Sequence, residues 1–377
     1  MDRSGCARAA FPENRTGDRV GGEGGEAVLR SSLRCARLPA CGGRSSLAPA
    51  KGPSNSLSTL WKRLLLARVA ATGARSRAQP ASTAAGGWPT GPARTRDGAT
   101  RGGKPSEAGA GSEKAHPPPT RETTMIDSHV HLNHPDFRED LDDVVARAGW
   151  AGVTTMVNIG FDLESSRETA ALTERFSIVR GAVGVHPHDA KTYTDGVETE
   201  FARLLETPAI VAVGEIGLDY YRDLSPRDTQ KAVFKRQLAL ARAKNKPVVI
   251  HCRDAFEDVM GILAAEGSRY HGVFHAFSGD TAMARDVLSL GFHIGVGGVI
   301  TFKNARLREV VSELPIGAIV LETDCPYLAP VPFRGKRNEP AYLRYVVEAV
   351  SAATGKTAEQ VVEATDENFA RAMKLAH

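Results

Sequence analysis

From Met125 onward, the apolar and polar positions follow two alternating periods. Short apolar runs predict strands at 125–132, 154–160, 178–186, 209–219, 247–252, 272–277, 292–300 and 318–324. Between and after them, apolar positions three and four residues apart predict helices at about 137–149, 163–176, 197–206, 226–245, 254–265, 280–290, 304–313, 339–354 and 357–374. Eight strand–helix pairs within 253 residues match a (β/α)₈ TIM barrel of the α/β class. A doubly wound open sheet is the alternative.

The first 124 residues show no such period. They are rich in Gly, Ala, Arg, Ser and Pro, a composition that buries too little apolar surface to fold. We expect a disordered basic extension, 1–124, before a barrel domain at 125–377. It is interpreted as a nucleic-acid-binding arm, a targeting segment, or residues never made because translation starts at Met125. The third is favoured, because no methionine occurs between Met1 and Met125.

Charge divides at the same point. Residues 1–124 hold 20 Lys and Arg against 9 Asp and Glu, whereas residues 125–377 hold 28 against 35. The net charge of +4 therefore describes neither part. A basic arm could bind nucleic acid, but an acidic body would repel it unless metal ions or local basic residues compensate.

Cysteine usage and hydropathy indicate a compartment. Of five cysteines, Cys252 and Cys325 lie in the barrel domain, too far apart in sequence to suggest a disulfide framework. No apolar run reaches the roughly 20 residues that span a bilayer. We expect a cytoplasmic protein with reduced thiols, no membrane segment and a monomeric state.

The stretch 125–132 carries the first candidate chemistry. In a strand, residues two apart share a face, so His129 and His131 point the same way and could bind one ion. Taken alone, the pair is as compatible with incidental histidines as with a metal site.

Later strands end in similar residues. Glu215 lies in the fourth strand, His251 ends the fifth, His275 lies in the sixth and Asp324 ends the eighth. Each could be a core or turn residue. Together with the first pair they make four histidines and two carboxylates, a set that suits two divalent ions with one carboxylate bridging them.

These stretches resemble the TatD family of metal-dependent deoxyribonucleases, which are amidohydrolase-like barrels. The matching segments are Ile126–Leu132, Gly184–His188, Gly214–Tyr221, Pro247–Ala255, His275–Gly279, Thr301–Asn304, Leu321–Leu328 and Arg334–Pro340. The resemblance spans 125–377 and none of 1–124. One departure is Phe333, where the family often has a histidine before the Arg334–Arg337 run.

The resemblance implies roles for the candidate residues. His129, His131 and Asp324 would hold one metal, His251 and His275 the other, and Glu215 would bridge them. Asp324 would also accept a proton from the attacking water, so Asp324 and Glu215 are the expected catalytic residues. The metals would be Mg, Mn or Zn, between which the sequence does not choose.

Substrate contacts are expected from His186, Arg253 and Lys303. His186 and His188 either line the pocket or form hydrogen bonds at a loop start. Arg337 is a further basic candidate for which solvated surface is the simpler interpretation.

The function implied is hydrolysis of phosphodiester bonds, as a 3′-5′ exonuclease on single-stranded DNA or another nucleic acid. The first alternative is a deacylase of aminoacyl-tRNA, or of another amide or ester, on the same barrel. The second is a nucleic-acid-binding protein without turnover, for which six metal ligands would be unnecessary.

Overall fold

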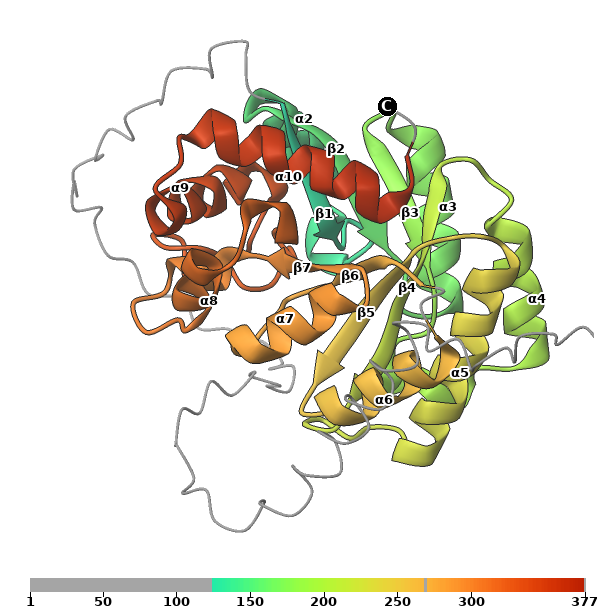
Figure 1. Cartoon of the computed structure of the whole chain (residues 1–377). Helices are drawn as coiled ribbons and strands as arrows, with labels where there is room; N and C mark the ends of the chain where they lie inside the picture. The colour runs from blue at the N-terminus through green and yellow to red at the C-terminus, as the bar shows by residue number, and fades with distance from the viewer. Residues whose placement is uncertain (1–123, 268–269, 376–377) are drawn as a thin grey trace, which may run out of the picture. The chain divides into compact units, whose positions relative to one another are not determined.

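The computed structural model describes residues 124–267 and 270–375 (Figure 1). Except for Thr124, the predicted basic extension lies outside the described residues. In the described part of the chain, no helix combines the length and apolar character needed to cross a membrane.

Eight parallel strands form one sheet in which each strand pairs with the next along the chain. They are β1 (Met125–Val130), β2 (Val153–Ile159), β3 (Val179–Val183), β4 (Ile210–Asp219), β5 (Val248–Arg253), β6 (Gly272–Phe274), β7 (Phe292–Val296) and β8 (Ile319–Leu321). The helices that follow them are α2 (Leu141–Trp150), α3 (Leu163–Arg175), α4 (Asp195–Leu204), α5 (Arg227–Ala243), α6 (Phe256–Glu266), α7 (Thr281–Ser289), α8 (Leu307–Glu313), α9 (Leu343–Thr354) and α10 (Ala358–Met373).

The sheet closes where β8 meets β1. The Asp324 amide donates to the His129 carbonyl at 2.9 Å, and the His131 amide donates to the Cys325 carbonyl at 2.9 Å. The buried Asp127 carboxylate accepts from the Thr323 amide at 2.9 Å and from its hydroxyl at 2.6 Å. The predicted (β/α)₈ barrel is therefore confirmed, and the seam that closes it lies beside two of the candidate metal ligands.

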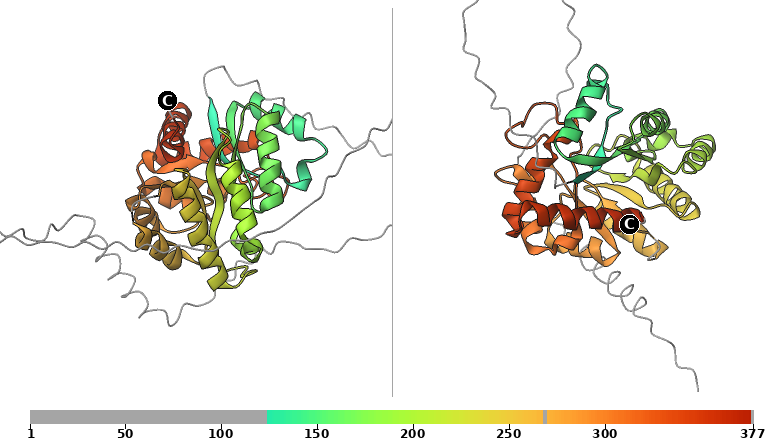
Figure 2. Two further views of the ribbon diagram at one scale, coloured as in Figure 1. Left: turned by 90° about the vertical axis from the view of Figure 1, so that its right-hand side faces the viewer. Right: turned by 90° about the horizontal axis from the view of Figure 1, so that it is seen from above.

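The barrel interior is filled by small apolar residues and sealed at one end. Val157, Ala182, Val249 and Val320 are among the residues of this inner core, which packs against Phe369 and Met373 of α10. The Ile126 amide, near the start of β1, donates to Asp366 of α10 at 3.1 Å. The helix thus covers the end where strands begin (Figure 2), and leaves the opposite mouth for chemistry.

Several strands end earlier than their apolar runs predict. The runs ending at residues 277 and 324 give strands that end at Phe274 and Leu321. Ala276 and Asp324 have φ of 44° and 56°, in the left-handed region. Because an extended strand cannot include such residues, the chain turns there, and the polar residues that follow lie in loops at the mouth.

Candidate metal centre

All six predicted metal ligands meet at the carboxyl-terminal mouth of the barrel. His129 lies near the end of β1, Glu215 in β4 and His251 in β5, whereas His275 and Asp324 follow β6 and β8. His131 is one residue beyond β1. Parallel strands bring their carboxyl ends to one mouth, which is why residues up to 195 positions apart in sequence converge.

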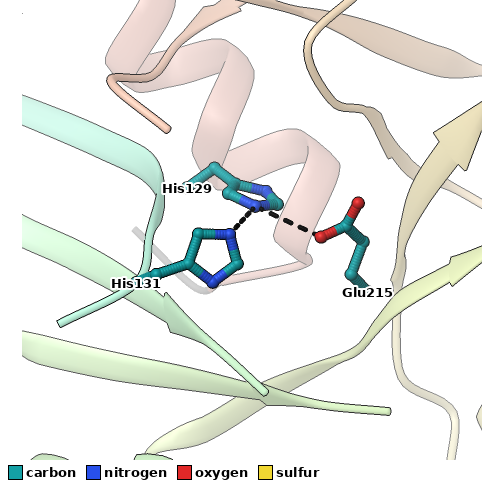
Figure 3. Close-up of side chains that lie close together, drawn as sticks. All are labelled: His129, His131 and Glu215. Carbon is teal, nitrogen blue, oxygen red and sulfur yellow. Dashed lines mark hydrogen bonds and ion pairs between the residues drawn. The ribbon is translucent and has the colours of Figure 1, made fainter. Parts of the chain in front are cut away.

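The first group of donors is built on β1. His129 Nε2 lies 3.2 Å from His131 Nε2 and 3.6 Å from Glu215 Oε2. Asp324 Oδ1 lies 3.7 Å from His129 Nε2 and 3.5 Å from His131 Nε2. Figure 3 shows the two imidazoles side by side, with Glu215 facing them from the opposite strand. One donor atom from each of His129, His131 and Glu215 lies within 4.8 Å of the other two.

The spacing of this group fits an ion. Two ligands held tetrahedrally at about 2.1 Å from one metal are roughly 3.4 Å apart. The observed separations of 3.2 to 3.7 Å bracket that value and exceed most hydrogen-bond lengths. The residues present therefore fit a divalent metal, which would be held by His129, His131, Glu215 and Asp324.

A second group surrounds the other oxygen of Glu215. His251 Nδ1 lies 2.7 Å and His275 Nε2 lies 2.8 Å from Glu215 Oε1, and His186 Nε2 lies 3.5 Å from it. The separations of 2.7 and 2.8 Å, from His251 and His275, are those of charge-assisted hydrogen bonds. One carboxylate thus faces two sets of histidines with its two oxygens.

The charges of the second group explain its contacts. Burial disfavours an ionised Glu215, but His275 and His186 outweigh it and hold the pKa of this carboxyl well below its usual value. Burial would lower the pKa of His275, but Glu215 raises it to about 10. The protonated imidazole therefore supplies a positive charge that a metal ion can replace on binding, with release of a proton.

His129 of the first group has a different protonation state from His275. Burial, and then the neighbouring His275, hold the pKa of His129 well below its usual value. The two rings stack with centroids 3.9 Å apart and an angle of 15° between their planes. His129 is therefore neutral at physiological pH, the form in which an imidazole binds a metal.

Comparison with known proteins now identifies the chain. Residues 126–374 match the family described as TatD related DNase. The chain belongs to this family. An uncharacterized metal-dependent hydrolase of Bacillus subtilis, YabD, is 41% identical over 256 residues, which cover 67% of this chain and 99% of YabD.

Two further relatives extend the likeness. The 3′-5′ ssDNA/RNA exonuclease TatD of Enterobacter lignolyticus is 38% identical over 251 residues, covering 65% of this chain and 96% of that protein. The crystal structure of YJJV, a TatD homologue from Escherichia coli K12, has a TM-score of 0.63 and 30% identity, and covers 67% of this chain and 98% of its own. The chain is thus a metal-dependent hydrolase of the TatD family.

An outer layer of carboxylates holds the histidines of this TatD barrel. Asp219, fully buried at the end of β4, lies 2.9 Å from His251 Nε2 and 3.0 Å from His188 Nε2. Burial opposes its ionisation, but these two histidines keep the pKa of Asp219 below its usual value. Asp219 therefore fixes the side of His251 that faces away from Glu215, as outer carboxylates do for metal-ligating histidines.

Glu322 occupies a similar place beneath the other histidines. Its Oε1 accepts from the Ala276 amide at 2.6 Å, whereas Oε2 is buried without a hydrogen-bond partner among the described residues. His129 Nδ1 and His275 Nδ1 are also buried without a hydrogen-bond partner in that part of the structure, although His275 Nδ1 lies 3.9 Å from Glu322 Oε1. One ligand atom from each of these three residues lies within 4.8 Å of the others. Glu322 thus faces the outward sides of two predicted ligands.

Asp127, Asp219 and Glu322 were not singled out from the sequence as contributors to the site. Each is two or four residues from a predicted ligand in the sequence, a spacing that would put it on the same face of an unbroken strand. That spacing was the signal available.

The three predicted substrate-binding residues differ in burial and in their contacts. His186 is buried, its Nδ1 accepts from the His188 amide at 3.1 Å, and burial, followed by the charge of His251, lowers its pKa to about 4. Arg253 ends β5, and its guanidinium carbon lies 3.8 Å from the Tyr221 ring centroid. Lys303 is exposed, and no contact described in the structure joins it to the donor groups.

The remaining candidates have structural contacts. Arg337 donates to both oxygens of Asp140 at 2.7 Å and to Glu339 at 2.7 Å, so it is an anchored residue rather than solvated surface. Phe333 stacks on Tyr342 with ring centroids 4.1 Å apart. The loop after β8 is thereby fixed to the barrel wall.

Proposed function

We propose that the protein is an exonuclease that hydrolyses single-stranded DNA from its 3′ end with two bound divalent ions. The observation that carries the proposal is the position of Glu215, whose two oxygens face two separate groups of histidines. A carboxylate shared in this way is typical of two-metal hydrolases that act on phosphate esters. The exonuclease name of the Enterobacter relative supports the substrate and its polarity.

In this proposal the donor groups would hold the ions as the family resemblance implies. His129, His131 and Asp324 would hold one ion of Mg, Mn or Zn, His251 and His275 the other, and Glu215 both. Bound there, the ions would lower the pKa of a water molecule and neutralise charge on the scissile phosphate.

The side chains divide the remaining work. Asp324 faces both β1 histidines and is almost buried, so its carboxylate is placed to accept a proton from an attacking water. His186 has its Nδ1 occupied by a backbone amide, so its Nε2 carries the proton and can donate a hydrogen bond. Arg253 provides a positive charge near the phosphate path.

One further observation favours the deacylase as a second candidate. A cavity of about 510 Å³ opens beside His275, and its wall includes Asp254, Glu257, Asp258 and Asp280. Arg306 also lines it. A mainly acidic wall suits the ammonium group of an aminoacyl ester better than a phosphate.

The test is a matrix of metals against substrates with the full-length protein. Labelled single-stranded DNA and a D-aminoacyl ester are assayed side by side with Mg, Mn and Zn at two salt concentrations. We expect DNA cleavage, slowed roughly 10²–10⁴-fold by Asp324→Asn, because both chemistries need the proton acceptor. Turnover of the ester with no cleavage of DNA under any metal would replace the nuclease by the deacylase.

Matched substitutions separate the two chemistries further. Arg253→Ala and Lys303→Ala should raise KM for DNA and reduce its dependence on salt, because a polyanion needs cations along its path. The ester should be indifferent to both changes. Lys356→Ala, a change of a cationic residue in the α9–α10 turn, is the control.

A further inference from the structure

Beyond the predicted metal ligands, the loop after β4 presents an exposed aromatic side chain. Tyr221 is 56% exposed, although it is only two residues beyond the fully buried Asp219. Its neighbour Tyr220 contrasts with it, because the Tyr220 hydroxyl donates to Asp258 at 2.6 Å and its ring carries Arg227 at 4.3 Å. The exposed part of the Tyr221 ring is therefore accessible to a ligand at the mouth of the barrel.

Arg253 covers one face of the Tyr221 ring. Its guanidinium carbon lies 3.8 Å from the ring centroid, a close cation–π contact. Nearby Arg227 pairs with Asp223 at 3.1 Å, but no carboxylate in the described residues lies within ion-pair distance of Arg253. The positive charge of Arg253 is therefore available to an anionic ligand.

The pair is fixed in place by the same residue that orients a metal ligand. Asp219 accepts from the Tyr221 amide at 3.0 Å, and it lies 2.9 Å from His251 Nε2. Asp219 and Arg253 are partners in the register of β4 and β5, and the Tyr220 amide donates to the Arg253 carbonyl at 2.9 Å. The ring and the guanidinium are thus held at a constant place next to the second donor group.

We propose that Tyr221 and Arg253 form a stacking platform for one unpaired nucleobase of the substrate. The base would stack on the face of Tyr221 that Arg253 leaves open, while the guanidinium edge binds an adjacent phosphate. A base in a duplex is already stacked and paired, so the platform selects single strands. This inference rests on the proposed nuclease function and adds the group by which a strand is recognised.

Substrates that lack a single base test the platform. Oligonucleotides carry one abasic site at successive positions from the 3′ end, and KM and kcat are measured for the native protein and for Tyr221→Ala. At one position the missing base should raise KM roughly 5- to 30-fold for the native protein, as expected for loss of one stacked base. With intact DNA, Tyr221→Ala should raise KM by the same factor. An abasic site at that position should then raise the KM of this variant no further.

Three variants complete the design. Tyr221→Phe retains the ring and should restore native KM. Arg253→Lys retains the charge and therefore the salt dependence, but it should lose part of the affinity because lysine cannot stack flat. Trp150→Ala removes a 73% exposed aromatic at the end of α2, on the opposite side of the barrel from the mouth, and should change nothing.

The outcomes separate the platform from the nuclease proposal. Binding of a labelled oligonucleotide to the metal-free protein is followed by fluorescence anisotropy in EDTA. If Tyr221→Ala leaves KM for DNA unchanged, the platform proposal is wrong and the nuclease proposal stands. The same follows if, at every position, the rise in KM caused by the abasic site adds to the rise caused by Tyr221→Ala. Binding that requires Tyr221 without cleavage under any metal supports the platform and overturns the nuclease.

Discussion

At the scale of single residues, the centre depends on one carboxylate that serves two sets of histidines. Glu215 Oε2 faces His129 at 3.6 Å, and Oε1 faces His251 and His275 at 2.7 and 2.8 Å. If two ions bind as proposed, replacing Glu215 should affect both together, unlike replacement of a ligand at the edge of either group.

We predict that Glu215→Gln loses metal and activity together. An amide keeps the size of the side chain but lacks the negative charge that would balance the two proposed cations, so we expect weakened binding of both. Metal content after dialysis and DNA cleavage measure the effect. Glu363→Gln, an exposed change on α10, is the control. Full metal occupancy in the Glu215 variant would refute the shared-ligand role.

The unpartnered atoms beneath the ligands lead to a second prediction. Glu322→Gln should weaken metal binding about 10- to 100-fold, because an outer carboxylate orients the histidines that it faces. Gly295→Ala should act in the same direction, since its Cβ would collide with Glu322 Oε2. Calorimetric titration of metal into the apoprotein measures both, with the exposed α9 change Glu348→Gln as control. Native affinity in both variants would show that Glu322 has no such role.

At the scale of elements, the seam between β1 and β8 connects barrel closure to the site. The Asp127 carboxylate accepts from the Thr323 amide and hydroxyl and, at 3.3 Å, from the His129 amide. The seam therefore fixes the end of β1, which carries His129, against the loop after β8, which carries Asp324.

Asp127→Ala should lower the free energy of unfolding by about 2–4 kcal/mol, because two buried donors of Thr323 lose their acceptor. Denaturant titration measures the change. The metal-free protein is used so that bound ions make no contribution to stability. Asp143→Ala, at an exposed position of α2, should change stability by less than about 0.5 kcal/mol. Equal stability of the two variants would contradict the role of Asp127 in the seam.

Much of this arrangement follows from sequence pattern. The alternation of apolar runs and helical periods predicts the barrel, and the polar residues at strand ends predict all six residues that meet at the mouth. The pattern does not show that Ala276 and Asp324 turn out of their strands, because φ depends on packing around them. It also does not show which acids contact the ligands, because such contacts depend on register between strands, as for Asp219 beside His251.

At the scale of the whole molecule, α10 makes stability depend on pH. Asp366 of this helix accepts from the Ile126 amide, and burial raises its pKa from 3.8 to about 7. The folded protein therefore keeps a proton that the unfolded chain releases above pH 4. Stability contributed by this group is greatest at low pH and falls as pH rises from about 4 to 7.

Asp366→Asn should remove the loss of stability between pH 4 and 7, because the amide oxygen still accepts from the Ile126 amide and carries no charge. As pH is raised from 5 to 8, we expect the free energy of unfolding of the variant to rise relative to that of the native protein by on the order of 2 kcal/mol. Unfolding by denaturant at the two pH values, in EDTA, measures the difference. The exposed change Asp143→Asn should show none. A constant difference between variant and native protein across this range would contradict the assignment.

The seal that α10 makes across the barrel also limits how a polymer could be degraded. Phe369 and Met373 close the end where the strands begin, so a DNA strand cannot thread through the molecule. In the proposed exonuclease, each released nucleotide would leave by the mouth through which the strand entered, and the shortened strand would withdraw before its new end could be seated. Digestion should therefore be distributive, with intermediates of every length visible on a sequencing gel at low enzyme concentration, whereas a threading nuclease would leave full-length strands beside mononucleotides.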